Sequence, residues 1–138
     1  MENLFAGYGL TSNGMLHLSP KEALEVCHLG AILVDVREDY LNEYKKFKVE
    51  RVIYLPLSLL KENAATLPLD IPLVFADSAG LRSKEAVAML KELGFQNIAN
   101  LAGGLIEWER DGLPLQTNEE EMLSGSCTCQ LRKRNKKI

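Results

Sequence analysis

A short polar loop at residues 77–82 is the part of the chain best suited to chemistry. It follows a continuously apolar run at residues 72–76 and precedes a helical pattern that starts near Glu85. A junction of strand, loop and helix points successive backbone N–H groups into one concavity at the positive end of the helix dipole, which makes a cradle for an anion. The loop consists of Asp77, Ser78, Ala79, Gly80, Leu81 and the cationic Arg82. The cradle lacks a nucleophile, because Asp77 stands at its first position.

Asp77 has two interpretations. In the first, its carboxylate accepts hydrogen bonds from the loop's own N–H groups and contacts Arg82, so that it is a built-in anion. In the second, it acts as a nucleophile or general base, which requires a second titratable group nearby. The chain contains two histidines, His17 and His28, and we predict neither as that partner. We favour the first interpretation.

A second set of candidate groups is the thiol pair Cys127 and Cys129, separated by Thr128. Such a pair can form a strained redox couple or bind a soft metal, but two ligands alone do not make a closed zinc site. The 13 residues from Pro114 to Cys127 span about 40 Å when extended, enough to reach across a small domain. The simplest interpretation is an exposed tail with incidental thiols, and we predict no metal and no cofactor.

Composition favours one globular domain in a reducing compartment. Of the 138 residues, 46% are hydrophobic and 25% are charged, and no apolar run approaches the ~20 residues of a membrane helix. The first residues carry no positive charge of the kind that opens a secretory signal. Three cysteines do not suggest a disulfide framework. We therefore expect a cytoplasmic protein that does not bind a membrane.

Charge is distributed unevenly along the chain. Five of the last seven residues are basic, and the remainder of the chain holds 11 basic and 19 acidic residues. An acidic body of this kind repels nucleic acid, and a short basic end is typical of a solvated tail. We expect no nucleic-acid partner.

Strand and helix patterns alternate along the middle of the chain. A capping box at Ser19 to Glu22 predicts a helix that runs to about His28. We predict strands at residues 31–36, 51–55, 72–76 and 97–101, and further helices at 37–47, 57–60, 85–93 and 105–110. Alternation of this kind favours a mostly parallel sheet with helices on both faces, whose functional site lies at the carboxyl ends of the strands.

The patterns divide the chain into an N-terminal extension at 1–16, a domain at 17–116 and a C-terminal tail at 117–138. We expect no regular element in the first 15 residues. Asp35 and Arg37 are predicted to fix the end of a strand near the rim of the site, whereas Glu38 and Lys84 are predicted to be solvated.

Four segments together resemble the rhodanese-like domain family over about residues 17–115. They are Ser19-Pro20 through Glu25, Leu33 to Glu38, the Gly80 to Ser83 end of the loop, and Leu101 to Gly104 with Trp108. The resemblance implies a sheet of about five strands. It also implies the transfer of a sulfane sulfur through a cysteine persulfide, and the six-residue loop is that of the sulfur-transferring branch rather than of the related phosphatases.

This sequence departs from the usual pattern of the family at two places. The position of the family's sulfur-bearing thiolate matches Asp77, and a carboxylate cannot accept and release sulfur as a thiolate does. Residues 46–52 also differ from the family's usual glycine-histidine-isoleucine-proline-glycine run. We therefore predict a protein without standard thiosulfate sulfurtransferase activity.

Two functions remain open on the sequence. The first is a binding or regulatory module that uses the loop rim to bind an unidentified protein or small molecule. The alternative is a sulfur-transfer or thiol-redox protein whose working thiols are Cys127 and Cys129.

Overall fold

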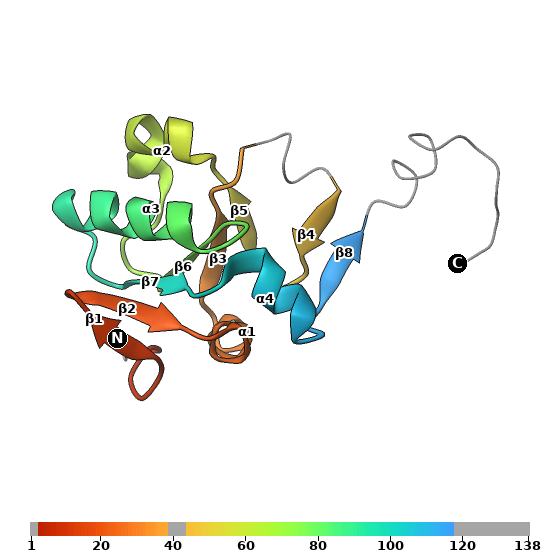
Figure 1. Ribbon diagram of the computed structural model, residues 1–138. Helices are drawn as coiled ribbons and strands as arrows, with labels where there is room; N and C mark the ends of the chain where they lie inside the picture. The colour runs from red at the N-terminus through yellow and green to blue at the C-terminus, as the bar shows by residue number, and fades with distance from the viewer. Residues whose placement is uncertain (1–2, 39–43, 118–138) are drawn as a thin grey trace.

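The computed structural model describes residues 3–38 and 44–117. Within them, a six-stranded sheet has the order β1-β2-β7-β6-β3-β5, and only the β1–β2 pair is antiparallel (Figure 1). The strands are β1 (Leu10–Ser12), β2 (Met15–Leu18), β3 (Ile32–Asp35), β5 (Val52–Tyr54), β6 (Leu73–Ala76) and β7 (Ile98–Leu101). The predicted mostly parallel sheet is confirmed, and β1 and β2 are strands that the sequence patterns did not predict.

Helices cover both faces of the sheet, as predicted. They are α1 (Pro20–His28), α2 (Leu57–Asn63), α3 (Leu81–Glu92) and α4 (Gly104–Arg110), with a 3₁₀ turn, η2, at Ala64–Thr66. In Figure 1, α2 and α3 lie on one side of the sheet and α1 and α4 on the other. No helix in the described part of the chain is long and apolar enough to cross a membrane.

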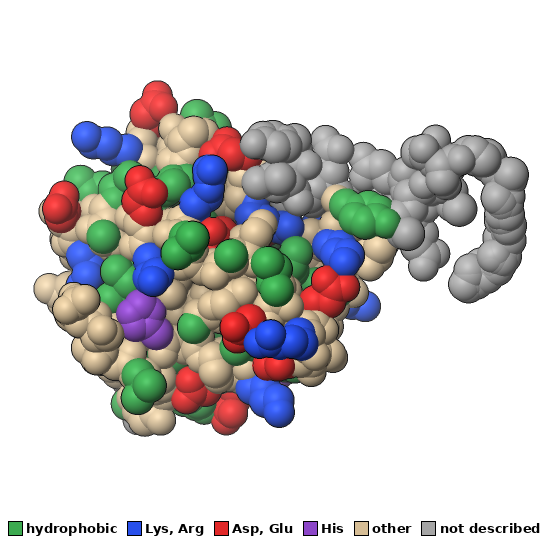
Figure 2. Space-filling model, in the orientation of Figure 1, with side chains coloured by type: hydrophobic (Ala, Val, Ile, Leu, Met, Phe, Trp, Pro, Cys, Tyr) green, Lys and Arg blue, Asp and Glu red, His purple; other side chains and the backbone are tan. Residues whose placement is uncertain are grey.

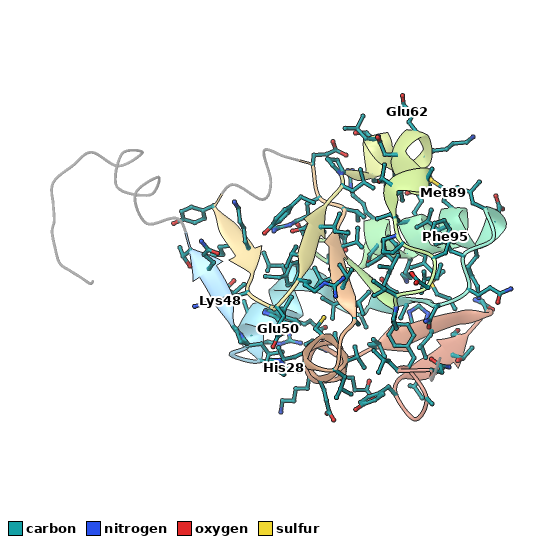
Figure 3. The ribbon with its side chains drawn as sticks, turned by 180° about the vertical axis from the view of Figure 1, so that it is seen from behind. His28, Lys48, Glu50, Glu62, Met89 and Phe95 are labelled. Atoms are coloured by element: carbon teal, nitrogen blue, oxygen red, sulfur yellow. The ribbon has the colours of Figure 1, made fainter. Side chains whose placement is uncertain are left out.

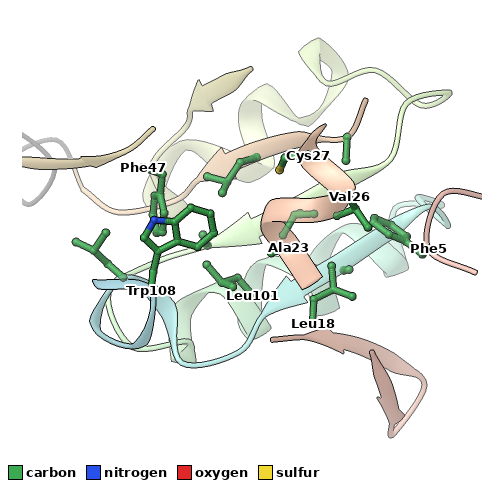
Figure 4. Close-up of a cluster of buried hydrophobic side chains, with 14 residues drawn as sticks. Phe5, Leu18, Ala23, Val26, Cys27, Phe47, Leu101 and Trp108 are labelled. Carbon is green, nitrogen blue, oxygen red and sulfur yellow. The ribbon is translucent and has the colours of Figure 1, made fainter. Parts of the chain in front are cut away.

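The central strands are apolar throughout because each buries both of its faces. Leu33 and Val74 point toward α1 and α4, where Trp108 is fully buried. Val34 and Phe75, one residue further along each strand, point toward α2 and α3. Figure 4 shows the first of these clusters, in which Phe47 meets the indole of Trp108 edge-on with ring centroids 5.2 Å apart. The two clusters fix β6, and therefore the loop that follows it.

The capping box at the start of α1 is present as predicted. The Ser19 N–H donates to Glu22 Oε1 at 3.0 Å, and the Glu22 N–H donates to Ser19 Oγ at 3.2 Å. The backbone N–H groups of Ser19 and Gly9 stabilise the charged form and lower the pKa of Glu22. At the other end of the helix, His28 Nδ1 lies 2.6 Å from Glu50 Oε2, on the side of the molecule seen in Figure 3.

The helix predicted at 37–47 is wrong at both of its described ends, and residues 37–38 are not helical. Lys45–Phe47 form strand β4, which pairs antiparallel with β8 (Leu115–Thr117). The spacing of aromatic residues suggested a helical stripe, but the pairing partner of β4 lies some 70 residues away and left no local signal. Residues 39–43, in the middle of the predicted helix, lie outside the described residues.

The expectation that the first 15 residues hold no regular element is also wrong. β1 and β2 form a hairpin around Asn13 and Gly14, whose φ angles are +53° and +76°. Both angles suit an Asn-Gly turn, which is the commonest tight hairpin connection. The side chain of Phe5 is buried against α1 in the first core cluster, so this segment packs onto the domain.

Candidate functional site

The loop at 77–82 is clamped between two helices. It leaves the central strand β6 and enters α3 through Gly80, whose φ is +96°. The first turn of α4 closes on it from the other side, where the N–H groups of Leu105 and Ile106 donate to the carbonyls of Asp77 and Ser78 at 2.8 and 3.0 Å. These two bonds turn the carbonyls of the loop toward α4.

Gly104 permits this close approach. A Cβ at residue 104 would lie 2.5 Å from the carbonyl oxygen of Asp77 and 2.6 Å from that of Ser78, both of which are backbone atoms. The φ of Gly104 is +60°, in the left-handed region that glycine adopts at no steric cost. The glycine pair at 103–104 is therefore part of the site, because it lets α4 dock on the loop.

The carboxylate of Asp77 fills the centre of the loop. It is 3% exposed. Its Oδ1 accepts the Gly80 N–H at 2.6 Å, and its Oδ2 accepts the Arg82 N–H at 2.9 Å. The hydroxyl of Ser83 lies 3.2 Å from Oδ1. The interpretation that Asp77 accepts the loop's own N–H bonds is confirmed, and its contact with Arg82 is made through the backbone of that residue.

A small hollow opens in front of the carboxylate. Its volume is about 190 Å³, and its lining comes from Arg37, Asp77, Ser78, Ala79, Leu81 and Arg82. This is smaller than the ~300 Å³ at which pockets for drug-sized ligands begin. The side chain of Arg82 is exposed at the mouth and forms no ion pair within the described residues.

Arg37 reaches the hollow from the end of β3 and is held firmly. Its Nη2 lies 2.8 Å from Asp35 Oδ2 and donates also to the Lys45 carbonyl at 2.8 Å, and its guanidinium lies over the ring of Phe47. Both members of the Asp35–Arg37 pair are buried. The predicted strand-end role of these residues is confirmed. They also tie β4 to the sheet.

Glu38 differs from its prediction, because its carboxylate binds the start of α2. The Glu38 carboxylate accepts the Ser58 N–H at 3.3 Å and the Ser58 hydroxyl at 2.9 Å. It therefore places a negative charge at the N-terminus of α2, where the helix dipole favours one. Lys84 is exposed as predicted.

Three polar residues near the loop were not predicted as parts of the site. Ser83 and Asn100 are buried, and they connect Asp77 to the half-buried His17 of β2. His17 does not contact Asp77 directly, so the prediction that it is not the catalytic partner of Asp77 stays a prediction; the contact through Asn100 and Ser83 was not predicted. The pairing of β2 with β7 places His17 opposite Asn100. Because β2 was not predicted as a strand, no sequence pattern indicated that these two residues lie side by side.

The described thiol does not belong to the site. Cys27 is buried under α1, and burial, with a smaller contribution from the charge of Glu50, raises its pKa to about 12. A thiol of that pKa is neutral at physiological pH and a poor nucleophile. Cys127 and Cys129 lie outside the described residues. Within those residues, no cluster of three or more His, Cys, Asp or Glu side chains could hold a metal ion.

Known proteins share both the sequence pattern and the fold. The model of the rhodanese-like domain matches residues 19–111. A sulfurtransferase from Allochromatium vinosum is 33% identical over 88 residues, which cover 64% of this chain and 80% of that protein. The thiosulfate sulfurtransferase GlpE of Haemophilus influenzae is 28% identical, with 72% and 93% covered. The crystal structure of a rhodanese-related protein from Thermoplasma volcanium superposes with a TM-score of 0.66 at 26% identity, covering 74% of this chain and 98% of that one.

Proposed function

The chain belongs to the rhodanese-like domain family, and we propose that it is a binding or regulatory member in which the Asp77 carboxylate replaces the sulfur-bearing thiolate. The observation that carries this proposal is the hydrogen bonding of that carboxylate. Two backbone N–H groups and one hydroxyl that converge at the centre of the loop already have Asp77 as their acceptor. The centre of the loop therefore holds its own anion.

The chemistry of sulfur transfer requires a group that Asp77 does not have. A thiolate attacks the outer sulfur of thiosulfate, a new S–S bond forms, and sulfite leaves with the electron pair of the broken S–S bond. Cyanide then takes the outer sulfur as thiocyanate and regenerates the thiolate. A carboxylate oxygen makes no comparable persulfide, and the described Cys27 is buried away from the loop.

The rim of the hollow supports a binding role. Leu81 is 69% exposed and Ile106 is 60% exposed, and the backbones of both adjoin the loop. The exposed guanidinium of Arg82, which forms no ion pair in the part of the chain that the structure describes, follows Leu81 in the sequence. Figure 2 shows hydrophobic side chains gathered over α3 and α4 on this face, with Lys and Arg side chains beside them. A partner segment that presents an apolar side chain next to an acidic group fits this rim.

The transfer of sulfur from thiosulfate to cyanide tests the proposal. We expect no turnover above background by the unmodified chain, and measurable turnover by Asp77→Cys, because the new thiol stands where the N–H groups of Gly80 and Arg82 converge. Ser78→Cys is the matched control, since it places a thiol one residue away, in the lining of the hollow, and should stay inactive.

The alternative based on Cys127 and Cys129 makes the opposite prediction. It requires turnover by the unmodified chain that disappears when both residues are changed to serine. That result would replace the proposed function with the alternative.

A further inference from the structure

The rim of the hollow combines exposed apolar side chains with exposed cations. Leu81, the first residue of α3, is 69% exposed, and Ile106 of α4 is 60% exposed. Arg82 and Lys84 are exposed on the first turn of α3, and neither forms an ion pair within the residues that the structure describes. Apolar side chains that adjoin a hollow and are bordered by cations are features of a binding surface.

The chain leaves β8 close to this rim. Thr117, the last residue of β8, pairs with Lys45 of β4. The Lys45 carbonyl accepts a hydrogen bond from Arg37 Nη2 at 2.8 Å, and Arg37 lines the hollow. Two contacts, one across the β4–β8 pair and one to Arg37, therefore connect Thr117 with the hollow.

Helix α4 continues the surface between Thr117 and the loop. Lys45 Nζ lies 2.7 Å from Glu109 Oε2, and Glu109 shares one face of the helix with Ile106, three residues before it. The Ile106 N–H donates to the Ser78 carbonyl of the loop. In Figure 1, β4 and β8 lie beside α4. Because Lys45 pairs with Glu109, the charge of that carboxylate is compensated along this surface.

The residues that follow β8 match the rim in their chemistry. Three carboxylates and two apolar side chains come in succession: Glu119, Glu120, Glu121, Met122 and Leu123. This run ends six residues after Thr117, and six extended residues span about 20 Å. A segment tethered by so short a linker has an effective concentration on the order of millimolar, so that weak contacts suffice to hold it.

We propose that residues 119–123 bind the rim of the hollow in their own chain. The three carboxylates face Arg82 and Lys84, and the two apolar side chains pack against Leu81 and Ile106. The inference rests on the proposed function, because it takes the rim to be a binding surface and names the segment that occupies it. A separate partner that binds the rim has to displace this segment.

NMR of the full chain tests the contact. Two variants remove its apolar and its charged part: Met122→Ser with Leu123→Ser, and Glu119→Gln with Glu120→Gln and Glu121→Gln. We expect the methyl signals of Leu81 and Ile106 to shift in both variants, and in the same direction, because both release the segment. The signals of Leu93, which is 49% exposed just after the other end of α3, should stay unchanged. Unshifted Leu81 and Ile106 signals, or an equal shift of Leu93, would overturn the proposal.

A matched control changes charges elsewhere in the same tail. Lys136→Gln with Lys137→Gln should leave the Leu81 and Ile106 signals in place, and a shift as large as that of the glutamate variant would overturn the proposal. Exposed charges are screened within about 3 Å at 1 M ionic strength. Added salt should therefore move these signals in the unmodified chain toward their positions in the variants.

Dilution identifies the chain that supplies the segment. Binding within one chain predicts Leu81 and Ile106 signals that do not depend on protein concentration. Signals that return to the variant positions on dilution would show that a second copy supplies the segment, and would overturn the proposal for a single chain. The NMR measurements require no sulfur transfer, so their failure is distinct from a failure of the proposed function, which the Asp77→Cys assay decides.

Discussion

Single residues set the properties of the loop. The Asp77 carboxylate satisfies the donors that surround it, because it offers two acceptor oxygens to Gly80, Arg82 and Ser83. Arg37 lines the same hollow but is committed to Asp35 and Lys45. Of the two arginines that line the hollow among the described residues, Arg82 is the exposed one.

Cys27 provides a pH-dependent test at this scale. Burial raises its pKa from an ordinary value of 9.0 to about 12, so folding favours the neutral thiol. The neutral Cys27 thiol stabilises the folded state fully at pH values below the thiol's pKa in the unfolded chain. This stabilisation is lost as the pH rises from about 9 toward 12. We expect the unfolding free energy, measured in urea, to fall in this range by up to about 1.4 kcal/mol per pH unit more than in Cys27→Ala. Equal slopes in both proteins would contradict the burial of a neutral thiol.

At the scale of elements, the docking of α4 on the loop is the decisive contact. The helix contributes two N–H donors to the carbonyls of Asp77 and Ser78, and Trp108 anchors it in the core. The Trp108 indole N–H also donates to the Pro114 carbonyl at 2.7 Å. Pro114 directly precedes β8. The shape of the loop therefore depends on a helix that follows it by more than 20 residues.

Gly104→Ala tests this docking. The added Cβ would overlap the backbone of Asp77 and Ser78, and α4 would have to move away from the loop. Gly112→Ala is the matched control, since Gly112 also has a positive φ, +74°, but its Cβ would meet nothing within 4 Å. Gly112→Ala should lower the unfolding free energy by about 1–2 kcal/mol, because alanine is strained at a positive φ. Gly104→Ala should lower it clearly more. Equal costs would argue against the close packing of α4 on the loop.

Elements with local signals could be predicted from the sequence, and elements that depend on distant partners could not. The capping box at Ser19 and the apolar run before Asp77 identified α1 and β6 correctly. β4 exists because it pairs with β8, and β2 because it pairs with β1 and β7. Missing β2 also meant missing the link from His17 to the loop, although the role of Asp77 as an acceptor was predicted correctly.

At the scale of the whole molecule, the fold is that of the rhodanese-like domain family. The parallel strands, the helices on both faces and the loop at the carboxyl end of β6 give the chain the architecture of its relatives. The edge hairpin adds His17 to this frame, where its side chain contacts Asn100. We propose that the loop itself lacks only the thiol at residue 77.

The most direct test of that claim is mass spectrometry of the loop peptide after incubation with thiosulfate. We predict a persulfide in the loop of the Asp77→Cys protein and none at residue 77 of the unmodified chain, with Ser78→Cys as the control that gains none. A folded Asp77→Cys protein whose loop acquires no sulfur would contradict the account, because it would show that the site differs from a working sulfurtransferase in more than this one residue.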